Sequence, residues 1–325
     1  MLAILPSNIF FALTFLTFSV SASDCLFGTH LHRRQSYGYS GESGPTNWHD
    51  LDPANEACGV GNFQSPIVLN GSTPFAIQPP FMTIPQVPSA NFTNVGATLQ
   101  VATNGTTIVD GEEYALRQFH FHTPSEHRIN NEFYPLEMQM VHESVNGSIE
   151  VITFLFELSE RGETTELLTS VIQNIDKVEH YGNSSVTGPL NFTVLIDAVQ
   201  TQPLYTYNGS LTTPPCTEGI TFFIVSNPLP IDVATFNALK HVMKFNARYA
   251  QNYLGGSNLL EVVSQLGDQG IHISFSRLCC KCAEGFGVDF VEAGYPGGNS
   301  TDVVLSPNTS DSGVRKRLPS VKFRV

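Results

Sequence analysis

The stretch QFHFHTPSEHRINNEFYPLEMQMVH, from Gln118 to His142, decides how this chain folds. Two of its histidines, His120 and His122, stand two residues apart, with Phe119 and Phe121 beside them. Successive side chains of a β-strand point to opposite faces, so the two histidines share one face and the two phenylalanines share the other. Two imidazoles in this arrangement can bind one metal ion, provided that a neighbouring strand supplies a third ligand.

A second alternating run, from Pro135 to His142, follows after a loop and suits such a neighbouring strand. Together with several other blocks in the same order, these two runs make the chain resemble the alpha-class carbonic anhydrases. The resemblance extends from Tyr37 to Leu254. Its blocks are Tyr37-Gly-Tyr39, Gln64-Ser-Pro-Ile67, Gln118-Phe-His-Phe-His122, Ser125-Glu-His127, Glu137 to His142, and Gly209-Ser-Leu-Thr-Thr-Pro-Pro215.

This resemblance implies a zinc ion held by His120, by His122 and by the residue two positions after Glu137. The family has a third histidine at that position, whereas this chain has Gln139. A glutamine oxygen is neutral, so it preserves the charge of the metal, but it is a poorer donor than imidazole. We expect Glu137 to accept a hydrogen bond from the Gln139 amide, and zinc affinity to fall by at least about 10- to 100-fold.

Two alternatives to this ligand set remain open. His142 could replace Gln139, but it lies three residues further along and therefore on the opposite face of a regular strand. Only a bulge or a register slip would bring it to the metal. The other alternative is an error in the sequence, because glutamine and histidine codons differ by one base and a histidine at position 139 would restore an ordinary enzyme.

The resemblance also implies roles for side chains around the metal. Thr212 would accept a hydrogen bond from a zinc-bound hydroxide and donate its own hydrogen bond to Glu126. The residues that would hold the His120 ring or order water are Gln118, Tyr39 and Thr213. The wall of the carbon dioxide pocket would consist of Val141, Val151, Leu211 and Phe222. Ala97 stands where fast members of the family carry a proton-shuttle histidine, so we expect slow proton export.

Short β-rich runs interrupted by Pro and Gly indicate a β-dominated α+β fold. They are Thr98–Ala102, Thr107–Val109, Leu116–His122, Met138–His142, Glu150–Phe156 and Ile220–Val225. Helices are predicted at Thr165–Ile175 and Ile231–Phe245, the second with a face formed by Val233, Phe236, Leu239, Lys240 and Met243. The resemblance adds that residues 35–255 form a single domain around a large, mostly antiparallel central sheet, with the metal site in a cleft.

The N-terminal residues predict export from the cell. Residues 1–23 combine a short apolar run with small residues at its end, as signal peptides do, and a buried N-terminal helix is the alternative. Residues 24–34 are a candidate pro-segment that ends in the dibasic pair Arg33-Arg34, although an ordinary exposed pair fits equally well. Nine N-x-S/T sequons begin at Asn70, Asn91, Asn104, Asn146, Asn183, Asn191, Asn208, Asn299 and Asn308. We expect a secreted glycoprotein, with Asn208 bare because a glycan there would crowd the site.

The six cysteines agree with an oxidising compartment. Cys58 and Cys216 occupy positions that resemble the disulfide of secreted members of the family, a link worth roughly 2 to 5 kcal/mol. Cys25, Cys279, Cys280 and Cys282 are expected to form local or intermolecular disulfides, since a zinc knuckle would need a second ligand pair nearby. Residues 256–325 are expected to form a flexible extension without the apolar terminal run of a lipid-anchor signal, so no membrane anchor is predicted.

A formal charge of −13 argues against binding to nucleic acid or to an anionic membrane surface. The function that the resemblance implies is reversible hydration of carbon dioxide to bicarbonate by a zinc-bound hydroxide, with one weakly held Zn²⁺ per chain. The alternative is a non-catalytic binding or structural module on the same fold that has lost its metal.

Overall fold

The structure, a computed structural model, describes residues 37–268. The expected signal peptide, the pro-segment and the cysteines other than Cys58 and Cys216 lie outside these residues.

The strands are β1 Val68–Leu69, β2 Phe81–Thr83, β3 Asn91–Asn94, β4 Leu99–Ala102, β5 Thr106–Val109, β6 Glu112–His122, β7 Arg128–Ile129, β8 Leu136–Ser144, β9 Ile149–Leu158, β10 Ser184–Val186, β11 Leu204–Ser210, β12 Glu218–Val225 and β13 Leu229–Ile231. The α-helices are α2 Trp48–Leu51, α3 Ala57–Val60, α4 Glu166–Ile172, α5 Thr193–Thr201, α6 Val233–Met243 and α7 Leu259–Asp268, and the 3₁₀ turns are Gly41–Ser43, Pro53–Asn55 and Ile175–Val178.

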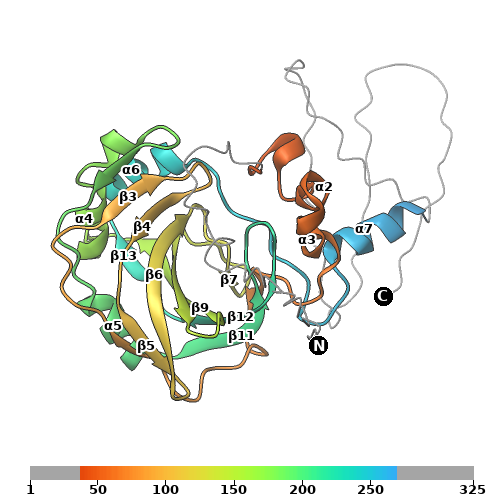
Figure 1. The fold of residues 1–325 in the computed structure, drawn as a ribbon, viewed down its shortest axis with the longest axis horizontal. Helices are drawn as coiled ribbons and strands as arrows, with labels where there is room; N and C mark the ends of the chain where they lie inside the picture. The colour runs from red at the N-terminus through yellow and green to blue at the C-terminus, as the bar shows by residue number, and fades with distance from the viewer. Residues whose placement is uncertain (1–36, 269–325) are drawn as a thin grey trace, which may run out of the picture. The chain divides into compact units, whose positions relative to one another are not determined.

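One 11-stranded sheet organises these elements (Figure 1). Its strand order is β10-β3-β4-β6-β8-β9-β12-β11, with β13 on β9, β5 on β6 and β2 on β5. Most neighbouring strands are antiparallel, and only β12 and β13 run parallel to their neighbour β9 among the described strands of this sheet. The prediction of a large, mostly antiparallel sheet is therefore confirmed.

A β-bulge in β6 sets which side chains face the site. Leu116 pairs with His142 and Gln118 pairs with Val141, so one extra residue, Arg117, is inserted in β6. The bulge reverses the alternation of faces. Leu116 and Phe119 thus share the large core cluster, although their numbers differ by an odd offset.

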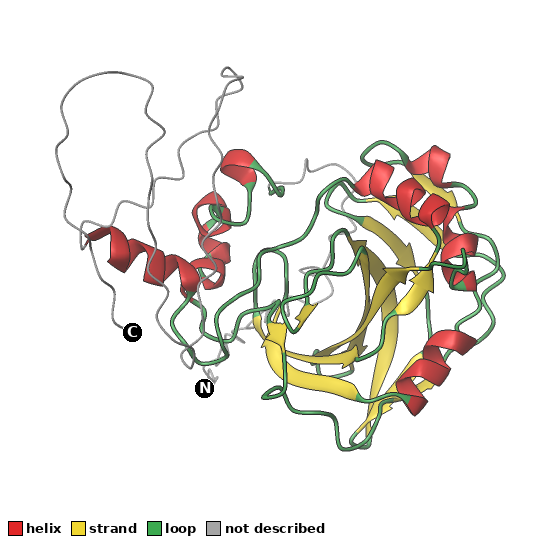
Figure 2. Ribbon diagram, turned by 180° about the vertical axis from the view of Figure 1, so that it is seen from behind, coloured by secondary structure: helices red, strands yellow, loops and turns green. Residues whose placement is uncertain are grey.

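The two faces of the sheet bury different hydrophobic clusters. The larger cluster contains Phe119, Phe121 and side chains of three helices, such as Leu168 of α4, Val199 of α5 and Leu239 of α6. Figures 1 and 2 show these helices together along the outer side of the curved sheet. The second cluster includes Val141, Val151 and Phe222, which are three of the predicted pocket residues. The candidate site is on the face that carries this second cluster.

Helix α6 is shorter than the predicted Ile231–Phe245. It begins after Asp232, whose side chain accepts hydrogen bonds from the Ala234 and Thr235 backbones. Leu239 and Met243 are buried as predicted, but Val233 is 56% exposed and does not contribute to the buried face. Helix α5 was not anticipated from the sequence.

A flexible extension was expected for residues 256–325, but Leu259–Asp268 form helix α7. It contacts α3, and the Asn258 side chain just before it donates a hydrogen bond to the Gly61 carbonyl oxygen at 3.0 Å. Its first residues, Leu259 and Leu260, are half-buried. Within residues 37–268, no helix is long and apolar enough to cross a lipid bilayer.

Candidate active site

Strand β6 presents His120 and His122 on one face, with ring centroids 5.1 Å apart. Each ring is held at Nδ1. Gln118 Oε1 lies 3.0 Å from His120 Nδ1, and the Asn246 backbone oxygen lies 2.8 Å from His122 Nδ1. Metal-binding histidines usually donate their other ring N–H in this way, which sets the tautomer and the ring orientation. In each ring, Nε2 is therefore the atom that could act as a metal donor.

Asn246, which was not singled out in the sequence, fastens the segment after α6 to this pair. Its side chain donates to the backbone oxygens of Phe121 and Ala97, both at 2.9 Å. Its Oδ1 accepts from the Thr123 backbone N–H at 2.7 Å. These bonds place the Asn246 carbonyl oxygen against the His122 ring. No spacing in the sequence indicates the contact, because 124 residues separate the two positions.

Gln139 lies opposite His120 in the β6–β8 pairing. Its Nε2 donates to Glu137 Oε1 at 2.9 Å, as expected, and also to Glu126 Oε2 at 3.0 Å. A carboxylate oxygen accepts hydrogen bonds, so both amide hydrogens of Gln139 are used by the two acids. The amide oxygen is therefore turned away from them and is the atom of Gln139 that could act as a metal donor.

Glu137 is fully buried and is held as a carboxylate by His127. The His127 ring lies 2.8 Å from Glu137 Oε1, and Glu137 Oε2 accepts from the backbone N–H groups of Glu126 and His127 at 2.8 Å. Burial opposes ionisation, but the charge and hydrogen bonds of His127 outweigh it and lower the pKa of Glu137 to about 2. Glu137 is thus an anionic acceptor that can orient the Gln139 amide.

The network continues beyond His127 into residues to which the sequence had given no role. His127 Nε2 lies 2.7 Å from the Tyr207 hydroxyl, which in turn donates to Ser65 Oγ at 2.9 Å. His127 and Ser65 both belong to blocks that carry the family resemblance, so their blocks could have indicated a role at the site. Tyr207, from β11, belongs to none of these blocks, and nothing in the sequence pointed to it.

Glu126 is the second buried carboxylate beside Gln139. Its Oε1 accepts from the Arg248 backbone N–H at 2.9 Å, and its Oε2 is 3.4 Å from His122 Nε2. Burial raises the pKa of Glu126, while His122 and a hydrogen bond with the Thr212 hydroxyl act in the opposite direction. Thr212 thus lies close enough to Glu126 to act on its carboxyl group.

A small cavity of about 20 Å³ adjoins these groups. That volume holds roughly one water molecule. Four of its lining residues are polar residues of the predicted site, namely His120, Gln139, Thr212 and Thr213. The other four are the residues predicted to form the apolar pocket wall, namely Val141, Val151, Leu211 and Phe222. The lining of the cavity thus combines polar and apolar side chains.

Tyr39 and His142 lie apart from the cavity lining. Tyr39 packs against the only tryptophan, Trp48, at a ring distance of 5.6 Å, and its buried hydroxyl has no hydrogen-bond partner in the described protein. His142 is fully buried, and its Nδ1 donates to the Met140 backbone oxygen at 3.0 Å. Met140 belongs to the core cluster on the far face of the sheet, so His142 is on the face opposite Gln139, as expected.

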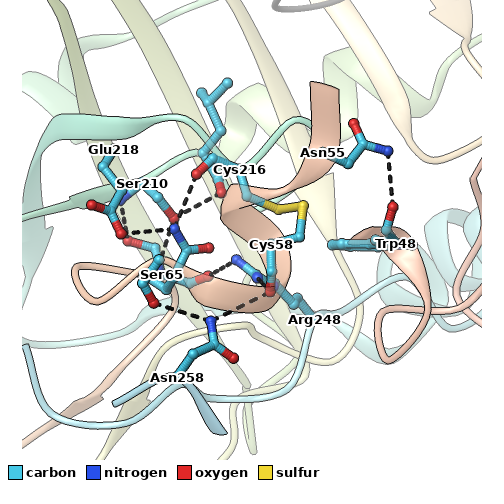
Figure 3. Close-up of a disulfide and its surroundings, with 12 residues drawn as sticks. Trp48, Asn55, Cys58, Ser65, Ser210, Cys216, Glu218, Arg248 and Asn258 are labelled. Atoms are coloured by element: carbon cyan, nitrogen blue, oxygen red, sulfur yellow. Dashed lines mark hydrogen bonds between the residues drawn. A yellow bond between two sulfur atoms is a disulfide. The ribbon is translucent and has the colours of Figure 1, made fainter. Parts of the chain in front are cut away.

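The disulfide between Cys58 and Cys216 is formed, as the resemblance implied. It joins α3 to the turn that follows Thr213. In this turn the Cys216 N–H donates to the Thr213 backbone oxygen at 2.9 Å. Figure 3 shows Arg248 beside it, donating to the backbone oxygens of Cys58 at 3.3 Å and Ser65 at 2.7 Å. The bridge thereby links the N-terminal segment to the loop that carries Thr212.

The residues at this site suit a divalent cation, with one weak donor. His122 Nε2 is buried and has no hydrogen bond in the described protein, as expected of a nitrogen that binds a metal. Both rings are already held at Nδ1, and Gln139 adds a neutral amide oxygen. Within residues 37–268, no group of three His, Cys, Asp or Glu residues is placed to hold a metal ion.

Comparison with known proteins agrees with this geometry. The family model described as eukaryotic-type carbonic anhydrase matches residues 43–259. A fungal alpha carbonic anhydrase structure from Aspergillus oryzae is 42% identical with a TM-score of 0.69, and the match covers 71% of this chain and 99% of that one. The alpha carbonic anhydrase of Thermovibrio ammonificans, in complex with the inhibitor sulfanilamide, is 33% identical with a TM-score of 0.61, over 68% of this chain and 96% of that one. A carbonic anhydrase from Pectobacterium atrosepticum is 32% identical over 70% of this chain and 87% of its own length.

Proposed function

This chain belongs to the eukaryotic-type, or alpha-class, carbonic anhydrase family, and on that premise we propose that it catalyses the reversible hydration of carbon dioxide to bicarbonate at a zinc site weakened by Gln139. The observation that carries the proposal is the small cavity, because polar His120, Gln139 and Thr212 line it together with apolar Val141 and Phe222. An uncharged substrate could rest on the apolar residues while the polar residues activate water.

The proposed holders of the zinc ion are His120, His122 and Gln139. A zinc ion would supply Lewis-acid chemistry that lowers the pKa of water to about 7. The three protein donors are neutral, so they would leave the charge of the metal intact. Gln118 and Asn246 orient the two rings through Nδ1. Glu137 orients the Gln139 amide.

The remaining polar groups would orient the nucleophile. Thr212 acts on the Glu126 carboxyl group and lines the cavity, so its hydroxyl would donate to Glu126 and leave its oxygen as an acceptor towards the cavity. An acceptor at that position would hold the proton of an attacking hydroxide and direct a lone pair of its oxygen at the substrate carbon. Thr213, next in the chain, lines the same cavity and would contact the product.

Proton export is the step for which this chain has no dedicated side chain at the family's shuttle position. Ala97 carries no titratable group and is only 4% exposed. Protons would therefore leave through water and dissolved buffer, and we propose a turnover below that of members with a shuttle histidine.

The experiment is a zinc determination after dialysis, together with a carbon dioxide hydration assay and inhibition by a sulfonamide. About one zinc per chain and sulfonamide-sensitive activity support the proposal. His120→Ala is the matched negative control, since it removes one ring and should abolish both zinc and activity. Activity that is equal in the variant and the unaltered protein would refute a role of this site.

The second candidate is a non-catalytic module with the same fold. It is favoured by Gln139, because both of its amide hydrogens are satisfied by Glu126 and Glu137 in a network that needs no ion. A folded protein that retains no zinc and does not hydrate carbon dioxide would support this candidate over the enzyme.

We also propose that the protein enters the secretory pathway and is glycosylated. The supporting observations are the Cys58–Cys216 disulfide, a kind of bond that persists in oxidising compartments, and the abundance of sequons. A secreted, glycosidase-sensitive product from a eukaryotic host would agree with this route.

A further inference from the structure

Two sequon asparagines lie at the two ends of one outer strand of the sheet. Strand β10 is at the end of the strand order and, among the described strands, pairs only with β3. Asn91 in β3 is opposite Val186, the last residue of β10. Asn183 immediately precedes the first residue of β10, and its backbone oxygen accepts from the Asn94 N–H at 3.0 Å.

Both asparagines are accessible for modification. Asn91 and Asn183 are both exposed. Phe92 and Asn94 of β3 are buried, so Asn91 and Thr93 project from the opposite, outer face. On that outer face the Thr93 hydroxyl lies 2.9 Å from the Ser184 hydroxyl. The residue that completes the Asn91 sequon therefore lies on the same exposed surface as Asn91.

The edge beside these asparagines is a place where other chains could attach. Val186 is 52% exposed. Its backbone oxygen accepts from the Asn174 side chain at 2.8 Å, which covers one position of the edge. Exposed sheet edges with apolar side chains promote edge-to-edge pairing, and proteins usually cover them or place charges there. None of the three residues of β10, Ser184–Val186, is charged.

We propose that Asn91 and Asn183 carry N-linked oligosaccharides that together cover the β10 edge and prevent self-association. The proposal rests on the secretory route proposed above. A sugar on Asn91 would lie over its cross-strand neighbour Val186, and a sugar on Asn183 would extend from the other end of the same strand. Two glycans at the ends of a three-residue strand leave little room for a second strand to approach it.

The other sequon asparagines in residues 37–268 lie outside β10 and its pairing with β3. The Asn208 Oδ1 accepts from Thr221 Oγ1 at 3.0 Å, and the Asn191 side chain donates to Glu166 at 3.0 Å. Asn146 lies in the turn between β8 and β9, is exposed and borders no outer strand. It is therefore a matched control for the loss of one glycan.

The test uses the full chain expressed in a eukaryotic secretory host. Mass spectrometry of glycopeptides, after enzymatic removal of sugars that converts each modified asparagine to aspartate, shows which sequons are occupied. Light scattering then measures the size of the particles in solution for Asn91→Gln, for Asn183→Gln and for the double variant. Asn146→Gln is measured in the same way as the control. Enzymatic trimming of the folded, unaltered protein provides a measurement that does not depend on how the variants fold.

We expect both asparagines to be occupied. The double variant and the trimmed protein should shift to larger species than the unaltered protein, and Asn146→Gln should not. Occupancy at other sequons, with Asn91 and Asn183 bare, would overturn the proposal while leaving the secretory route intact. A double variant and a trimmed protein that keep the unaltered size would overturn the covering role. Complete absence of glycans would overturn the proposal together with its premise.

Discussion

The Gln139 amide nitrogen lies 3.0 Å from Glu126 Oε2, so the side chain at the third ligand position is bonded to the carboxylate that also contacts Thr212. In this chain one residue thus connects the proposed metal donors to the group that would orient the nucleophile. A change at position 139 is therefore expected to affect both the metal affinity and the orientation of the Thr212 hydroxyl.

Gln139→His should raise zinc affinity by at least about tenfold and increase the hydration rate, because imidazole is the stronger zinc donor. Competition with a chelator of known affinity measures the first effect and a stopped-flow assay the second. Gln139→Leu, which keeps the approximate size without a donor, is the control and should bind less zinc than the unaltered protein. Equal zinc affinity in all three proteins would show that position 139 does not contribute a ligand.

The hydration rate should increase with the concentration of a small buffer such as imidazole. Ala97 provides no titratable group at the family's shuttle position, so in the proposed mechanism dissolved buffer would accept protons from the site. The rate is measured at fixed pH and ionic strength over a series of buffer concentrations. A rate that is already maximal at the lowest buffer concentration would indicate an internal shuttle elsewhere in the chain.

Glu137→Gln should lower the free energy of unfolding by about 3 kcal/mol, because it removes a buried charge that serves several donors. The amide has one acceptor oxygen, whereas Glu137 accepts from two backbone N–H groups and from His127. Chemical denaturation measures the loss. Glu132→Gln, on an exposed turn, is the control and should change stability by less than about 0.5 kcal/mol. Similar losses in both variants would contradict the structural role of Glu137.

Replacing Cys58 and Cys216 by serine should lower stability by about 2–5 kcal/mol, because the bond closes a loop of 158 residues. It should also weaken sulfonamide binding, since the loop that carries Thr212 and Thr213 loses its tie to α3. Thermal unfolding and inhibitor titration measure the two effects. Unchanged inhibitor affinity with reduced stability would confine the disulfide to a structural role.

Two buried groups on the far face of the sheet should make the stability of the protein depend on pH in opposite directions. Burial raises the pKa of Glu150 from 4.5 to about 7, so its contribution to stability is lost as pH rises through that range. Burial lowers the pKa of His142 from 6.5 to about 4, so its contribution is lost as pH falls through that range.

Glu150→Gln should therefore gain stability relative to the unaltered protein as pH rises from about 4.5 to 7, and the difference should level off above 7. Urea unfolding midpoints across this pH range provide the measurement. A stability difference that does not vary with pH would show that Glu150 does not titrate in this way.

Local patterns determined much of this protein. Alternation predicted that His120 and His122 would share a face away from Phe119, and the odd offset predicted His142 on the opposite face of β8 from Gln139. The resemblance supplied the Cys58–Cys216 pair, which is formed, and named residues that line one small cavity. The strand faces could be predicted because strand periodicity is a property of neighbouring residues.

Only the tertiary structure decided how these parts meet. The bulge at Arg117 depends on the pairing of β6 with β8, and without its reversal of faces the histidines would share a face with Tyr114 and Leu116. The Asn246 carbonyl reaches His122 across 124 residues of sequence. The second partner of Gln139, Glu126, lies 13 residues away on a different segment. Such contacts arise when distant segments close around a common core, and no local period of the chain encodes them.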